Sequence, residues 1–167
     1  MGLDMMLVKR KKDLKKENKE VEWNETSEIA YWRKANQVHK WFVDNVQNGV
    51  DDCGYYEVTI EKLQELVDIC REILREVKLI DGKVLLRDYY TNESGKTEHI
   101  KEYGIGKVID KPEICKELLP TQDGFFFGDT NYNEYYYEDI EHTRNRVQAI
   151  IDLLEWELYD VYYTSSW

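Results

Sequence analysis

The sequence predicts an α+β fold in which a small, mostly antiparallel sheet packs against about three main helices. Apolar residues recur every three or four positions from 60 to 77 and again from 136 to 158, which is typical of amphipathic helices. Residues 83–90 and 96–108 have strand-like composition and flank a turn at 92–95, so 83–108 is expected to be a hairpin insertion. The 167 residues suit one compact domain, 1–167, because no repeat or linker divides them.

The first part of the chain predicts a strand followed by a loop. Residues 3–8 alternate weakly and are expected to lie inside the sheet. Residues 9–25 are first basic, with seven Lys and Arg side chains between 9 and 19, and then polar. A run of this kind is typical of a solvated loop, and the alternative is an arm that attracts anions.

A first long helix is predicted over 28–47, with Thr26 or Ser27 as its cap and Asn48-Gly49 at its end. At helical spacing, its stripe contains Asn36 and His39 among apolar residues. Either these two side chains are buried and hydrogen-bonded, or they face a ligand together with the neighbouring side chains. Those neighbours are Trp32, Arg33 and Lys40.

The remaining elements follow from caps and turns. Residues 51–58 predict a turn and a short strand, and Thr59 caps an amphipathic helix in which Cys70 is a core residue. Asp81-Gly82 is expected to form a turn. A short helix is predicted from Pro112 to Leu119, a strand or extended loop from Gly124 to Gly128, a long helix capped by Asp129 or Asn133, and an aromatic strand over 159–165.

Charge and composition exclude several classes of protein. The formal charge of −11, from 34 acidic and 23 basic residues, disfavours direct binding to nucleic acid or to an anionic membrane. No apolar run approaches the roughly 20 residues that span a bilayer. The three cysteines lack a disulfide or metal spacing. These features predict a cytoplasmic protein.

No catalytic pattern accompanies the fold. None of the three histidines lies in a metal or nucleophile motif, and no glycine-rich phosphate loop is present. We therefore expect a protein that is not an enzyme and that carries no cofactor or metal.

The segment 120–140 is the candidate binding surface because it combines seven aromatic residues with glycines and polar groups. A pocket is expected between the first helix and Gln122–Tyr135. In this pocket the rings of Trp32, Phe126 and Tyr132 would stack on a ligand, and Arg33 and Lys40 would neutralise its phosphate groups. His39 would line the same face of the helix. The orientation of the ligand would be fixed by Asn36, Gln122, Asp129 and Thr130. The alternative is that Phe125 and Phe127 are core residues and that the tyrosines line a packed surface.

Four stretches carry a resemblance to a known group: Met1-Gly2-Leu3-Asp4-Met5, Tyr31-Trp32-Arg33-Lys34-Ala35-Asn36, Asp51-Asp52-Cys53-Gly54-Tyr55-Tyr56, and Leu119-Pro120-Thr121-Gln122 with Asp129-Thr130. In this order they resemble small uncharacterised proteins encoded by bacteriophages and prophages, over nearly the whole chain. The resemblance implies a protein that acts on host machinery in the host cytoplasm.

Two functional hypotheses follow. The first is a non-enzymatic binding protein that sequesters a small nucleotide-like ligand, such as a signal of host immunity, and so counters host defence. The second is an acidic interaction module that blocks a host protein by mimicking nucleic acid. A homo-oligomer is compatible with both.

Overall fold

The computed structural model describes residues 2–17, 20–92 and 95–167 and confirms the α+β class. The main sheet has the order β2-β1-β6-β3, with every neighbouring pair antiparallel. Its strands are β1 (Asp4–Lys11), β2 (Thr26–Arg33), β3 (Tyr56–Val58) and β6 (Tyr159–Ser166). A separate pair consists of β4 (Leu79–Thr91) and β5 (Glu98–Ile109). The helices are α1 (Lys12–Glu17), the 3-10 turn η1 (Trp23–Glu25), α2 (Asn36–Asn45), α3 (Ile60–Glu76), α4 (Pro112–Leu118) and α5 (Glu134–Leu153).

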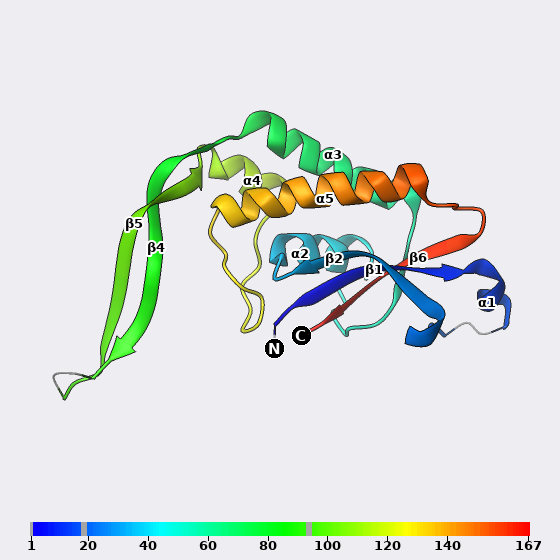
Figure 1. Ribbon diagram of the computed structural model, residues 1–167, viewed down its shortest axis with the longest axis horizontal. Helices are drawn as coiled ribbons and strands as arrows, with labels where there is room; N and C mark the ends of the chain where they lie inside the picture. The colour runs from blue at the N-terminus through cyan, green and yellow to red at the C-terminus, as the bar shows by residue number, and fades with distance from the viewer. Residues whose placement is uncertain (1, 18–19, 93–94) are drawn as a thin grey trace.

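The core lies between the main sheet and a layer of helices. In Figure 1, α2, α3 and α5 lie on the same side of the sheet, with α2 below α5. Met5 and Leu7 of β1 are fully buried, and Phe42 of α2 stacks on Tyr163 of β6 with ring centroids 4.0 Å apart. Burial of such aromatic and aliphatic surface is the main stabilising contribution to the domain.

The predicted basic loop at 9–25 is wrong. β1 continues to Lys11, paired with β6, and Lys12–Glu17 forms the short helix α1. Acidic side chains pair with this basic run. The buried Arg10 forms an ion pair with Glu25 (2.5 Å), and Lys15 forms one with Glu57 of β3 (2.5 Å). The positive charge therefore does not require a solvated loop.

The predicted helix over 28–47 is wrong in its first part. Residues 26–33 form β2, which pairs with β1, and the helix α2 begins only at Asn36. Ala30 and Trp32 are buried whereas Tyr31 and Arg33 are exposed, which is the period of two of a strand. Lys34 has a positive φ of 59° and separates the two elements.

Most elements after residue 50 match their predictions. Thr59 caps α3 by accepting a hydrogen bond from the Lys62 amide (3.2 Å), and Cys70 is fully buried on that helix. Asn133, one of the two predicted caps, begins α5 by accepting from the amides of Tyr135 and Tyr136. Burial raises the pKa of the Cys70 thiol to about 12, so this cysteine is an unreactive core residue.

Strands β4 and β5 form a long two-stranded arm that extends away from the rest of the molecule (Figure 1). β4 is longer than the predicted 83–90, whereas β5 starts two residues after and ends one residue after the predicted 96–108. Asp81-Gly82 lies inside β4 instead of forming a turn. Residues 93 and 94 of the predicted turn lie outside the described residues. At its base the arm is joined to the chain before α5, because the Ile109 amide donates to the Tyr132 carbonyl (3.1 Å).

The loop between α4 and α5 is held by one buried side chain. Asn36, fully buried at the start of α2, donates to the carbonyls of Phe127 (3.0 Å) and Asp129 (2.9 Å) and accepts from the Gln122 amide (2.9 Å). Within this loop Gly124–Gly128 is a turn and not a strand, with the Phe127 amide donating to the Gly124 carbonyl (3.1 Å). We call these three contacts of the Asn36 side chain the Asn36 clamp.

We expect Asn36→Ala to lower the free energy of unfolding by about 2–4 kcal/mol, because it leaves the buried Phe127 carbonyl and the partly buried Asp129 carbonyl and Gln122 amide without their partner. Lys40→Ala is the matched control on the same helix, where an ion pair with Asp44 is worth about 0.5 kcal/mol or less. Chemical denaturation of both variants measures the difference. An equally small loss of unfolding free energy in both variants would contradict a stabilising role of the clamp.

Candidate functional site

Two hollows flank the segment 129–135, which precedes and begins α5. The larger, of about 870 Å³, lies between the arm, α4 and this segment, and the smaller, of about 270 Å³, lies between the start of α2 and α5. Asp129, Asn131, Asn133 and Tyr135 line both. The larger hollow has the volume of typical small-molecule sites.

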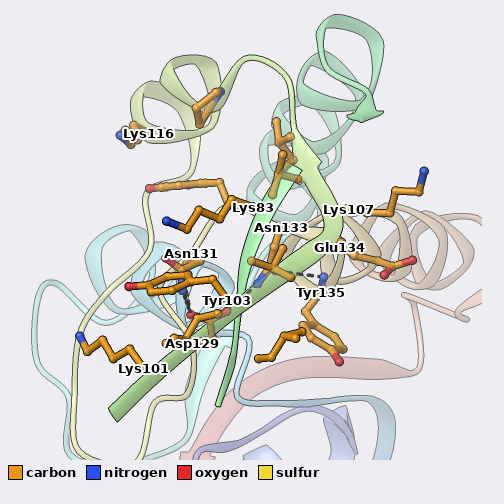
Figure 2. Close-up of a pocket in the computed structure, with 18 residues that line it drawn as sticks. Lys83, Lys101, Tyr103, Lys107, Lys116, Asp129, Asn131, Asn133, Glu134 and Tyr135 are labelled. Atoms are coloured by element: carbon orange, nitrogen blue, oxygen red, sulfur yellow. Dashed lines mark hydrogen bonds between the residues drawn. The ribbon is translucent and has the colours of Figure 1, made fainter. Parts of the chain in front are cut away.

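Lysines from separate elements gather at one side of the larger hollow. Figure 2 shows Lys83, Lys101 and Tyr103 of the arm on the same side as Lys116 of α4 and Asn131. Lys107 also lines this hollow, but its ammonium group pairs with Asp81 (2.6 Å). The positive groups available to a ligand are therefore those of Lys83, Lys101 and Lys116, which we call the lysine cluster.

Two of these ammonium groups stand over aromatic rings and not beside carboxylates. Lys83 Nζ lies 4.2 Å from the centroid of the Tyr103 ring, and Lys116 Nζ lies 5.6 Å from that of Tyr132. In the part of the chain that the structure describes, neither forms an ion pair with a carboxylate, whereas Lys101 is 4.0 Å from Asp88. An aromatic ring stabilises a cation without neutralising it, so positive charge persists here in a chain of net charge −11.

The segment 129–135 is a wall with fixed geometry. The carboxylate of Asp129 accepts from the Asn131 amide (3.0 Å), the Asn131 side chain (2.6 Å) and the Asn133 side chain (2.6 Å). The Tyr132 hydroxyl accepts from the Thr121 amide (3.2 Å). Because Asp129 is engaged by these donors, its charge is partly compensated within the wall, and the wall keeps its shape when a ligand enters.

The smaller hollow places a buried carboxyl group near two cations. Arg33 and Lys34 line it together with Gln37, whose side chain donates to Asp139 Oδ2 (3.1 Å). Burial raises the pKa of Asp139 to about 6, against the lowering effect of the Gln37 hydrogen bond. Arg33 is already paired with Asp4 (3.1 Å), so little free positive charge faces this hollow.

Three of the predicted ligand-binding residues are core residues. Trp32 is 2% exposed, and its indole donates to Thr143 Oγ1 (2.9 Å), so its ring offers no face to a ligand. Asn36 forms the clamp, and His39 is fully buried. For Asn36 and His39 the arrangement agrees with the buried, hydrogen-bonded alternative.

His39 joins two other groups in an arrangement that resembles a catalytic relay. Its Nε2 lies 2.9 Å from Asp51 Oδ2 and its Nδ1 lies 2.7 Å from the Tyr163 hydroxyl. However, Tyr163 is fully buried and stacked on Phe42, and burial raises its pKa well above the ordinary value. A hydroxyl that no substrate can approach cannot serve as a nucleophile, so these contacts are structural.

The other predicted residues are divided between the hollows and the surrounding loop. Tyr132 and Asp129 line the larger hollow, and Arg33 and Asp129 line the smaller one. Lys40 pairs with Asp44 (2.7 Å). Outside both linings are Lys40, Gln122, Phe126 and Thr130. Phe127 is buried as the alternative proposed, whereas Phe125 is 96% exposed at the tip of the loop.

Sequence reasoning missed the lysine cluster. Lys83 and Lys101 become neighbours through the register of the arm, and Lys116 joins them only when α4 packs beside it. The signal in the sequence was the alternation of charged and apolar residues along the predicted hairpin. This alternation predicts which side chains share one face of the hairpin but not which other element packs beside that face.

Comparison with known proteins identifies no relative, since no family model, curated protein or solved structure matches the chain. Among the helices of the described residues, none combines the length and apolar character needed to cross a membrane. Within those same residues, no group of three or more His, Cys, Asp or Glu side chains is placed to hold a metal ion. The site must therefore be interpreted from its own geometry.

The raised pKa of Asp139 predicts a pH-dependent effect of Asp139→Asn. Between about pH 4 and pH 6 the folded protein holds a proton that the unfolded chain releases, so this group's contribution to stability falls as the pH rises. We expect Asp139→Asn to raise the free energy of unfolding by about 1–3 kcal/mol at neutral pH and to have little effect near pH 4. Thermal melts at both pH values, with Glu138→Gln as the exposed control, measure it. A gain that does not depend on pH would contradict the assignment.

Proposed function

We propose that this protein is a non-enzymatic binding protein that holds a small anionic ligand with a planar group, such as a nucleotide, in the larger hollow. The observation that supports this most directly is the lysine cluster, in which Lys83 and Lys116 stand over tyrosine rings. The hollow therefore offers positive charge and aromatic surface together, as a nucleotide requires.

Each part of such a ligand has a partner in the hollow. Phosphate oxygens would accept from Lys83, Lys101 and Lys116, and the start of the 20-residue helix α5 adds a favourable field for negative charge. A base would lie beside Tyr103, which is 51% exposed, where stacking contributes roughly 1–3 kcal/mol. The side-chain carbonyl oxygen of Asn131, a residue whose backbone and side-chain N–H groups already donate to Asp129, would orient the ligand by accepting a hydrogen bond.

The residues that line the larger hollow favour binding of a ligand over catalysis. The lining contains no Ser, Thr, Cys or His side chain, and of its two carboxylates, Asp129 and Glu134, the first is engaged by three donors. A general base or nucleophile would need a free group within hydrogen-bond reach of the ligand. Sequestration needs affinity alone, and the resemblance to phage proteins makes a signal of host immunity the ligand that we propose.

Calorimetric titration with cyclic dinucleotides and ADP-ribose tests the proposal. We expect binding by at least one of them, weakened about tenfold or more by Lys83→Ala and again by Lys116→Ala, because each removes a charge-assisted contact. Lys107→Ala is the matched control, since this lysine lines the same hollow but its charge is already paired with Asp81. No binding by any member of the panel, or equal loss in the control, would overturn the proposal.

A second function is favoured by Phe125. This side chain is 96% exposed at a loop tip, and its ring meets that of Phe126 edge to face at 4.8 Å. Exposed aromatic residues are common anchors of protein interfaces. If the acidic chain blocks a host protein instead, Phe125→Ser should abolish capture of that protein whereas Lys83→Ala should not.

A further inference from the structure

The register of the arm sorts its side chains into two unlike faces. Pairs such as Lys83 with Ile105 and Asp88 with Lys101 lie on one face, which also carries Tyr103 and which we call the polar face. The opposite face, which we call the aliphatic face, carries three glycines, the charged pair Arg87 and Glu102, and Thr91 with Glu98 near the tip of the arm. Its apolar residues are Ile80, Val84, Leu86, Tyr89, Ile100 and Val108.

The three glycines make the aliphatic face flat. A Cβ atom on Gly82 would lie 2.4 Å from Val108 Cγ2, one on Gly104 would lie 2.6 Å from Leu86 Cδ1, and one on Gly106 would lie 2.7 Å from Val84 Cγ2. Each aliphatic side chain therefore lies across the backbone of a glycine on the other strand. The result is a smooth apolar surface that another flat surface can approach closely.

Among the described residues, the only backbone pairing of the arm outside its own two strands is the isolated β-bridge between Val108 and Asn133 at its base. Leu86 is 61% exposed and Ile80 is 41% exposed on the aliphatic face. An isolated two-stranded hairpin is marginally stable at best in water, and packing against a further layer stabilises it. The aliphatic face thus has the character of half of a sheet-on-sheet interface.

We propose that the aliphatic face packs against the same face of a second copy of this chain, so that two arms form a four-stranded sandwich. The charge distribution favours this occupant. Residues 79–109 hold five basic and five acidic side chains, so that the net charge of −11 belongs to the remainder of the chain. The arms project from the acidic bodies (Figure 1). A contact between two neutral arms therefore brings less negative charge together than a contact between two bodies would.

The low charge of the aliphatic face also favours a second copy of this chain over a charged partner. A basic protein would be drawn to the acidic body and an acidic one would be repelled by it, whereas the aliphatic face carries the charged side chains of Arg87, Glu98 and Glu102. In a two-fold arrangement each Arg87 can meet the Glu102 of the other copy, so the pair is self-complementary. Because Val84, Leu86, Gly106 and Val108 of the aliphatic face also line the larger hollow, ligand binding is tested with variants of the lysine cluster and self-association with variants of the aliphatic face.

Light scattering and sedimentation of the full chain over a range of concentrations test the proposal. We expect a species of twice the 20.1 kDa monomer mass, little weakened by salt because the contact is mainly apolar. Leu86→Glu should yield monomer at every concentration. Ile105→Glu is the matched control, because Ile105 is more exposed (79%) but lies on the polar face, and it should leave the dimer intact.

Cross-linking provides a second readout that does not require a disruptive substitution. In a Cys53→Ser background, a short bismaleimide should join two copies through Leu86→Cys but not through Ile105→Cys, since Cys70 and Cys115 are buried. Circular dichroism confirms that each variant is folded. A monomeric wild-type chain at all concentrations, a dimer that survives Leu86→Glu, or equal cross-linking of both cysteine variants would overturn the proposal.

Discussion

The Asn36 clamp is the interaction on which the arrangement of the surface depends. One buried amide contacts three points of the loop between α4 and α5, and the last of them, the Asp129 carbonyl, begins the wall that both hollows share. A buried amide whose donors and acceptor are all used fixes the orientation of its partners more strictly than apolar packing does. The same wall carries the Asn133 cap of α5 and accepts the hydrogen bond that ties the base of the arm, so the position of the arm follows from the clamp as well.

Charge is distributed unevenly over this framework. The basic run of β1 and α1 is compensated by Glu25, Glu57 and Asp160, and Arg33 is compensated by Asp4. In contrast, Lys83 and Lys116 meet aromatic rings. A strongly acidic protein thereby keeps a local positive potential at one hollow, where low-dielectric walls strengthen its effect on an anion. Ligand binding and self-association would then use the same hairpin, since Val84, Leu86 and Val108 of the aliphatic face also line the larger hollow.

The sequence predicted the fold best where local signals were sufficient. Thr59, Pro112 and Asn133 mark helix starts that need no distant partner; the first two were predicted correctly, and Asn133 was one of the two caps predicted for the last helix. The wrong prediction of a helix at 28–33 has another cause. Trp32 fits an apolar stripe of a helix and a strand equally well, and only the pairing of this segment with β1 decides between them. The site shows the same division. Asp129 and Tyr132 were found from the composition of their own segment, whereas the lysine cluster requires three elements to come together, which no local pattern reports.

The place of β6 in the main sheet has a consequence for the order of folding. This strand lies between β1 and β3, and it pairs Asp4 with Ser166, residues separated by almost the whole chain. β1 and β2 can form a hairpin early, but one edge of β1 stays open until residues 159–166 have been synthesised. Such a sheet closes late and slowly, because long-range pairing must first overcome the entropy of loop closure. During translation the unpaired edge of β1, with its apolar residues Met5 and Leu7, is the part of the nascent chain most in need of protection by a chaperone.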